Sequence, residues 1–189
     1  MNAELDYAYR LAEATLCREV PVRWAHSVSV MKRAMQAGPM FDAAELDLLC
    51  SASILHDIGY ASAARVTGFH ALDGARFLEK NSTPVRVCAL VAHHSCAYME
   101  AELRGQSAQL AKWVDEKTAL RDALWWADMT TTPNGGVTNV RGRIAEIQER
   151  YGPEHLVTFF IRQAMPELVA AVERTEERLR AVGVDYTAK

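Results

Sequence analysis

We predict an all-α fold, a helical bundle in a single domain. Half of the 189 residues are hydrophobic and 24% are charged, as in ordinary globular proteins. No segment alternates apolar and polar residues with period two, whereas helix start and stop signals recur along the chain. No internal repeat, low-complexity tract or linker separates two parts. We therefore expect one domain over residues 1–189, with about seven to nine helices.

The clearest predicted helix start is at Asp42. Asp42 has the side chain of an N-cap, and Glu45 stands three residues later, where it completes a capping box. The apolar pattern then runs to Gly59, a residue that can take the left-handed conformation that ends helices. This places His56 and Asp57 in the last turn of the helix.

A later helix is predicted to begin at Thr83-Pro84, which pairs an N-cap residue with proline at the first helical position. Its apolar pattern arrives at His93. A second helix end therefore presents histidine side chains.

The C-terminal part is predicted to be helical over residues 153–182. Gly152-Pro153 ends one helix and opens the next, and Pro166 is expected to break or kink the last segment. These helices should pack on the preceding part of the chain.

Charge and targeting signals narrow the class of partner. The formal net charge is −3, so there is no basic footprint for a nucleic acid duplex. No apolar stretch approaches the length of a membrane span or a signal-peptide core. No two of the four cysteines form a C-x-x-C pair, so we expect reduced thiols. The sequence thus predicts a cytoplasmic protein that acts on a small molecule and binds no duplex and no membrane.

Histidine is concentrated in one part of the chain. Five of the six histidines fall between residues 26 and 94, and two aspartates accompany them in sequence; this set comprises His26, His56, Asp57, His70, His93, His94 and Asp128. Imidazole and carboxylate are ligands that suit zinc, manganese and iron. In the adjacent His56-Asp57 pair, the histidine can serve one ion while the carboxylate bridges to a second, about 3.5–4 Å away.

This order of residues resembles the HD superfamily of metal-dependent phosphohydrolases. His26, His56-Asp57 and Asp128 match its H…HD…D signature, and residues 56–59 match the HDIG form. His70 and the pair His93-His94 look like the extra ligands of its two-metal branches. The resemblance covers about residues 20–150.

The resemblance implies two divalent metal ions, of Fe, Mn, Zn or Mg. One ion would take His26, His56, Asp57 and Asp128, and the other would take Asp57, His70 and His93. Whether His94 binds metal directly or supports a ligand stays open. Asp57 would be the bridging, catalytic carboxylate.

Three arginines are candidates for binding phosphate, because guanidinium can grip two phosphate oxygens at once. They are Arg23, Arg65 and Arg141. Each can equally be a surface charge. His155 is expected to lie outside the site, and Asp73 is expected to be a solvated helix residue.

These features predict an HD-type phosphohydrolase that acts on a small phosphoester, such as a nucleotide or a related metabolite, by means of a metal-activated water. The same ligand types suit two irons, so an HD oxygenase of mixed-valent di-iron type, acting on a small polar or phosphonate substrate, is the alternative. A regulatory module that holds metal without turnover is the third possibility.

Overall fold

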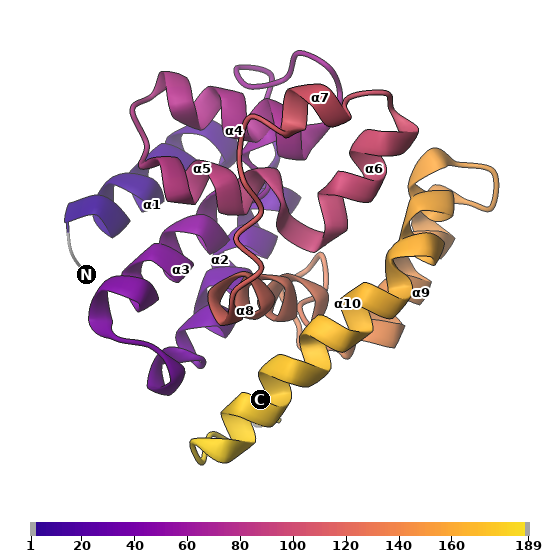
Figure 1. Cartoon of the computed structure of the whole chain (residues 1–189). Helices are drawn as coiled ribbons and strands as arrows, with labels where there is room; N and C mark the ends of the chain where they lie inside the picture. The colour runs from indigo at the N-terminus through magenta and orange to yellow at the C-terminus, as the bar shows by residue number, and fades with distance from the viewer. Residues whose placement is uncertain (1–2, 188–189) are drawn as a thin grey trace.

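The computed structural model describes residues 3–187, and its regular secondary structure is all helical (Figure 1). Within this range there is no strand, and one isolated bridge joins Thr131 to Val137. The all-α prediction is confirmed. The α-helices are α1 Ala3–Leu16, α2 Pro21–Met35, α3 Ala43–Leu55, α4 His70–Lys80, α5 Val85–Ala92, α6 Ala97–Leu103, α7 Ser107–Leu110, α8 Ala119–Met129, α9 Val140–Tyr151 and α10 Leu156–Ala181.

Three short 3-10 turns complete the described part of the chain: η1 Gly38–Met40, η2 Ile58–Tyr60 and η3 His94–Cys96. There are ten α-helices in this range rather than the expected seven to nine, and α6 and α7 are the short ones. Both lie where the sequence has no extended apolar period.

Helix α3 lies at the centre of the packing. It contacts α1, α2, α5 and α8, and all residues from Leu49 to Leu55 are buried. Helices α1 to α5 form one side of the molecule, and α9 and α10 lie across α8 on the other (Figure 1). The carboxyl end of α3, with His56 and Asp57, is therefore enclosed by elements from the whole chain.

Helix ends follow the capping signals in several places. The Asp42 side chain accepts the backbone N–H of Glu45 at 2.9 Å, as the capping box predicted. Asn139 caps α9 by accepting the N–H of Gly142. His155 caps α10 through Nδ1, which accepts the N–H of Val157.

Two predicted helix boundaries are wrong. α5 begins at Val85 with Pro84 at the cap position, and the Thr83 hydroxyl makes no capping bond. α10 begins at Leu156, three residues after Pro153, and continues through Pro166 to Ala181. Tertiary packing outweighs the proline signal, because α10 buries an apolar stripe against α8 and α9 along its length.

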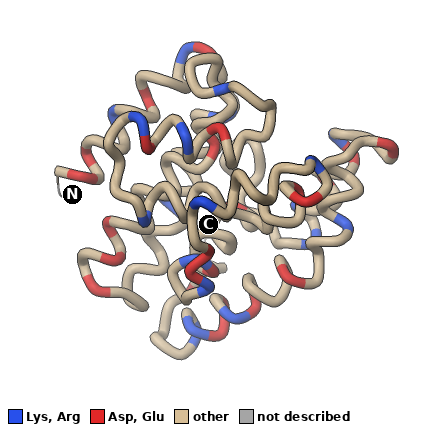
Figure 2. The backbone as a smooth tube through the Cα atoms, turned by 45° about the horizontal axis from the view of Figure 1, so that its top comes forward, with Lys and Arg blue, Asp and Glu red and all other residues tan. Residues whose placement is uncertain are grey.

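Acidic and basic residues are interspersed along the backbone (Figure 2). None of the helices of residues 3–187 has the length and apolar character needed to cross a membrane.

Candidate metal centre

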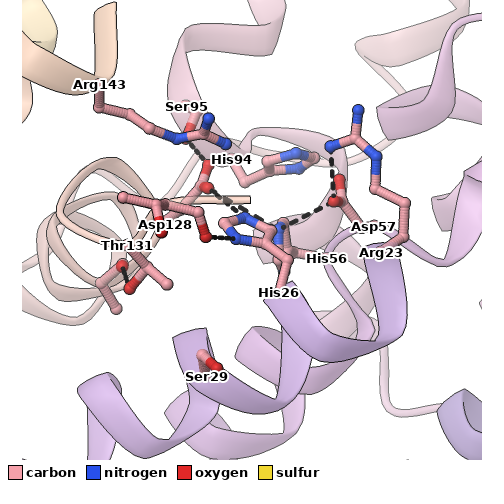
Figure 3. Close-up of polar contacts among 12 residues, drawn as sticks. Arg23, His26, Ser29, His56, Asp57, His94, Ser95, Asp128, Thr131 and Arg143 are labelled. Carbon is pink, nitrogen blue, oxygen red and sulfur yellow. Dashed lines mark hydrogen bonds and ion pairs between the residues drawn. The ribbon is translucent and has the colours of Figure 1, made fainter. Parts of the chain in front are cut away.

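Two groups of potential metal ligands meet at the end of α3, and Figure 3 labels all of them except His70. In the first group, His26 from α2 and Asp128 from α8 flank His56. His26 Nε2 lies 3.0 Å from Asp128 Oδ1, and His56 Nε2 lies 3.8 Å from the same oxygen. Three ligands about 2.0–2.2 Å from one ion are separated by roughly these distances.

The second group consists of Asp57, His70 and His94. His70 opens α4 and its Nε2 lies 3.1 Å from His94 Nε2 and 3.7 Å from Asp57 Oδ1. Asp57 Oδ2 lies 3.5 Å from His56 Nε2, in the first group. The two oxygens of Asp57 thus face different groups, which is the arrangement a bridging carboxylate needs.

Backbone carbonyls fix the tautomers of three of these histidines. Nδ1 of His26, His56 and His94 lies within 3.0 Å of the carbonyl oxygens of Thr132, Ser53 and Val91, respectively. A carbonyl only accepts, so we assign the proton to Nδ1 in each ring. Nε2 is then left with its lone pair facing the interior of the site, as in histidines that ligate metals.

A divalent ion fits these donors because the site contains polar atoms that the protein does not satisfy. His56 Nε2 is buried and has no hydrogen-bond partner. The Nε2 atoms of His70 and His94 face each other at 3.1 Å. A cation beside these nitrogens would satisfy the orphaned acceptor of His56 and accept the lone pair of His94.

The electrostatics also favour the metal-binding protonation states of four of these ligands, His56, Asp57, His70 and Asp128. Burial lowers the pKa of His56 and, more strongly, of His70, where the neighbouring His94 adds to the effect. Burial alone would raise the pKa of Asp57, but His56 and Arg23 lower it far below its usual range. For Asp128, the neighbouring His26 and His56 outweigh burial and lower the pKa. These shifts favour a neutral imidazole at His56 and His70 and an ionised carboxylate at Asp57 and Asp128.

His93 belongs to neither group of ligands. Its Nε2 lies 2.7 Å from the carbonyl oxygen of Trp113, so this nitrogen is the donor and is not free for metal. Its own carbonyl accepts the indole N–H of Trp125. His93 therefore ties α5 to the segment before α8, and His94 is the member of the pair that faces the site, contrary to the predicted order of importance.

A close backbone approach positions His70. A Cβ on Gly59 would lie 2.0 Å from the carbonyl oxygen of His70, so only glycine lets η2 pack against the start of α4. Gly59 has no positive φ, so its role is close approach and not the predicted left-handed helix end. Gly59, the glycine of the HDIG segment, thus allows His70 to take its place in the second ligand group.

Asp73 holds the loop that precedes His70. Its carboxylate accepts the backbone N–H groups of Val66, Thr67 and Gly68. The residue is fully buried, so its interpretation as a solvated residue is wrong.

Ser95 follows His94 in a strained backbone conformation and contacts the first ligand group. Its φ is +47°, and that of Cys96 is +62°. Ser95 Oγ donates to Asp128 Oδ2 at 2.5 Å (Figure 3). The turn thereby points two adjacent side chains at different groups: His94 to the second and Ser95 to the first.

Four of the six ligands, Asp57, His70, His94 and Asp128, line a cavity of about 330 Å³. Five arginines line it as well, whereas no lysine does within the described range; they are Arg23, Arg65, Arg104, Arg143 and Arg150. Arg23 and Arg65, predicted to bind phosphate, are thus at the cavity. Arg141 is exposed and does not line it, and Arg143, two residues later, does. His155 lies at the cavity, although it was expected outside the site.

Sequence reasoning missed Ser95 and three of the arginines. A signal existed for Arg143, because it shares the helical spacing of the buried Val140, Ile144 and Ile147. For Ser95 the sequence held no signal, since its position depends on the left-handed turn.

Comparison with protein families agrees with this geometry. The model of the HD domain family matches residues 23–124, more than half of the chain, and the chain belongs to this family. The match includes the histidines from His26 to His94 and ends four residues before Asp128. Neither a curated protein nor a solved structure matches the chain. Family membership indicates a metal-dependent hydrolase type of activity.

Proposed function

We propose that the protein is a phosphohydrolase that uses two divalent ions to hydrolyse a small phosphoester. The observation that carries the proposal is the pair of three-ligand groups joined by Asp57 beneath a cavity lined by arginines. Bound divalent ions would supply a water of lowered pKa and offset the charge that develops on the phosphoryl group. Arginine is the side chain best suited to grip phosphoryl oxygens.

Different residues of the protein would position the ligands and bind the phosphoryl group. Asp57 holds both groups together, and the backbone carbonyls orient the histidine rings. Arg23 donates to Asp57 Oδ2 at 3.0 Å and stacks on Tyr60, so its guanidinium is held at the edge of the site. Arg143 lies on the opposite side, next to Asp128 (Figure 3). The two arginines can bind phosphoryl oxygens from either side of the ligand cluster.

The test compares Asp57→Asn with Asp47→Asn, a matched change on α3 away from the site. Metal-depleted protein is reloaded with Fe, Mn, Zn or Mg, and phosphate release is measured from a panel of phosphomonoesters with and without oxygen. We expect release by the unmodified protein and by Asp47→Asn, independent of oxygen, and no release by Asp57→Asn together with lower metal content.

Two results would contradict the proposal. Full turnover by Asp57→Asn would exclude a bridging carboxylate from the reaction. Oxygen-dependent consumption of a substrate without phosphate release would assign the site to oxygenase chemistry instead.

A further inference from the structure

We propose that the substrate carries a second anionic group at the end opposite its scissile phosphate, and that Arg65, Arg104 and Arg150 bind this group. The proposal rests on the phosphohydrolase function proposed above and names its substrate class. It follows from how the five arginines of the cavity are divided between the ligands and the rest of the wall.

Two arginines belong to the metal centre. Arg23 is ion-paired with Asp57, and Arg143 lies next to Asp128. Arg143 is 4% exposed, and its Nε is buried without a hydrogen-bond partner. Figure 3 shows these two guanidinium groups on opposite sides of the ligand cluster. This inner pair suffices for one phosphoryl group.

The other three arginines make no ion pair with Asp57 or Asp128. They come from three separate segments: the loop before α4, the residue after α6, and the last turn of α9. Glu100 holds Arg104 at 2.7 Å, and Glu146 holds Arg150 at 3.2 Å. Arg65 is exposed and has no hydrogen bond or ion pair through its side chain in the described structure, so no carboxylate of the protein offsets its charge.

Glu146 is not part of the cavity wall, and its carboxylate pairs with both Arg143 and Arg150. Glu100 does line the cavity and offsets the charge of Arg104. Arg65, Arg104 and Arg150 together therefore retain a net positive charge, mainly that of Arg65. This charge is not paired with the carboxylates of the metal centre. An exposed guanidinium at the wall of a ligand cavity, not paired with a carboxylate, is available to bind an anion.

The remaining wall defines what joins the two anionic ends. Apolar side chains of α9 and α10, including Ile147, Phe160 and Ile161, line the cavity. A volume of about 330 Å³ lies at the small end of ligand pockets, which span about 300–1,000 Å³. The geometry thus points to a compact organic body with a phosphoester at one end and a phosphate or carboxylate at the other.

The experiment uses matched pairs of substrates that differ in the second anion: phenyl phosphate against 4-carboxyphenyl phosphate, and propyl phosphate against propane-1,3-diol bisphosphate. Metal-loaded protein should hydrolyse the doubly anionic member of each pair with the higher kcat/KM. Arg65→Gln should reduce this preference about 10-fold or more, since charge-assisted hydrogen bonds are the strong class. Arg141→Gln, an exposed arginine outside the cavity, should leave it unchanged.

A binding measurement separates recognition from turnover. Calorimetry without oxygen compares propane-1,3-bisphosphonate with propylphosphonate, neither of which has a P–O–C bond to hydrolyse. The bisphosphonate should bind more tightly, and Arg65→Gln should remove the difference. Equal hydrolysis and equal binding within each pair would overturn the second-anion site and leave the phosphohydrolase function standing. Absence of hydrolysis for all four esters, with the bisphosphonate still preferred, would count against the proposed function alone.

Discussion

Two adjacent histidines do different work in this molecule because the chain turns sharply after them. His94 Nε2 faces His70 in the second ligand group, whereas His93 Nε2 is used on the carbonyl of Trp113. Both side chains are buried, so burial does not distinguish them. The hydrogen-bond partners do, and they lead to opposite expectations for the two alanine variants.

His94→Ala should remove one of the two metal ions and leave the fold intact, because it deletes one of three donors in its group. His93→Ala should keep both ions but lower the free energy of unfolding by about 1–3 kcal/mol, since a buried carbonyl loses its partner. Metal analysis and urea denaturation of the two variants measure this difference. Loss of metal from His93→Ala at unchanged stability would reverse the assignment.

Ser95 supports a ligand at the cost of backbone strain. A non-glycine residue at φ +47° is disfavoured, and the hydroxyl reaches Asp128 from this conformation. Ser95→Gly should relax the backbone yet weaken metal affinity about 10–100-fold, as for other groups that orient ligands. Competition with a chelator measures the affinity. Ser82→Gly, an exposed serine with φ +58°, is the control and should leave the metal affinity unchanged.

At the scale of elements, the packing of η2 on α4 decides where His70 lies. A methyl group on Gly59 would overlap the backbone of His70 and Gly74, and backbone atoms cannot rotate away. Gly59→Ala should therefore destabilise the fold by about 3 kcal/mol, the upper end for overpacking, and reduce binding of the second metal. Thermal unfolding and metal content measure both effects.

Gly142→Ala provides the comparison for Gly59→Ala. Gly142 lies in α9, where an added Cβ would meet only the ends of the Thr138 and Asn139 side chains. Alanine is the better helix former, so this variant should be neutral or more stable. Similar losses in both variants would mean that the close approach at Gly59 does not matter.

The sequence identified the elements of the site better than the directions of its side chains. Asp42 marked the start of α3, and the His56-Asp57 pair marked its functional end. The choice between His93 and His94 depended on the left-handed residues Ser95 and Cys96, which no local pattern predicts. Arg141 and Arg143 are two residues apart on a helix and point in nearly opposite directions, so the helical phase had to be known.

At the scale of the whole molecule, α10 must be held against α8 for the cavity wall to form. Asp122 on α8 is 3% exposed and accepts hydrogen bonds from Arg121, Arg174 and Arg178. Arg174 and Arg178 belong to α10. The apolar stripe of α10 provides burial, and this network adds an electrostatic link between the two helices.

Asp122→Asn should lower the free energy of unfolding at pH 7 by about 3 kcal/mol, because it leaves the arginines without their carboxylate. This figure is at the low end for buried ion pairs, because the side chains of Arg174 and Arg178 are 40% exposed. Burial would raise the pKa of Asp122, but the arginine hydrogen bonds outweigh it and the pKa is lowered from 3.8. A depressed carboxylate pKa contributes stability above the unfolded value, and that contribution disappears as pH falls through the folded value. The difference in the free energy of unfolding between the unmodified protein and Asp122→Asn should therefore have its full size at pH 7 and become smaller below about pH 4. Urea denaturation at several pH values measures this difference, with Asp47→Asn as the control. If the difference stayed constant down to pH 2, the loss of stability in Asp122→Asn would come from packing rather than from charge.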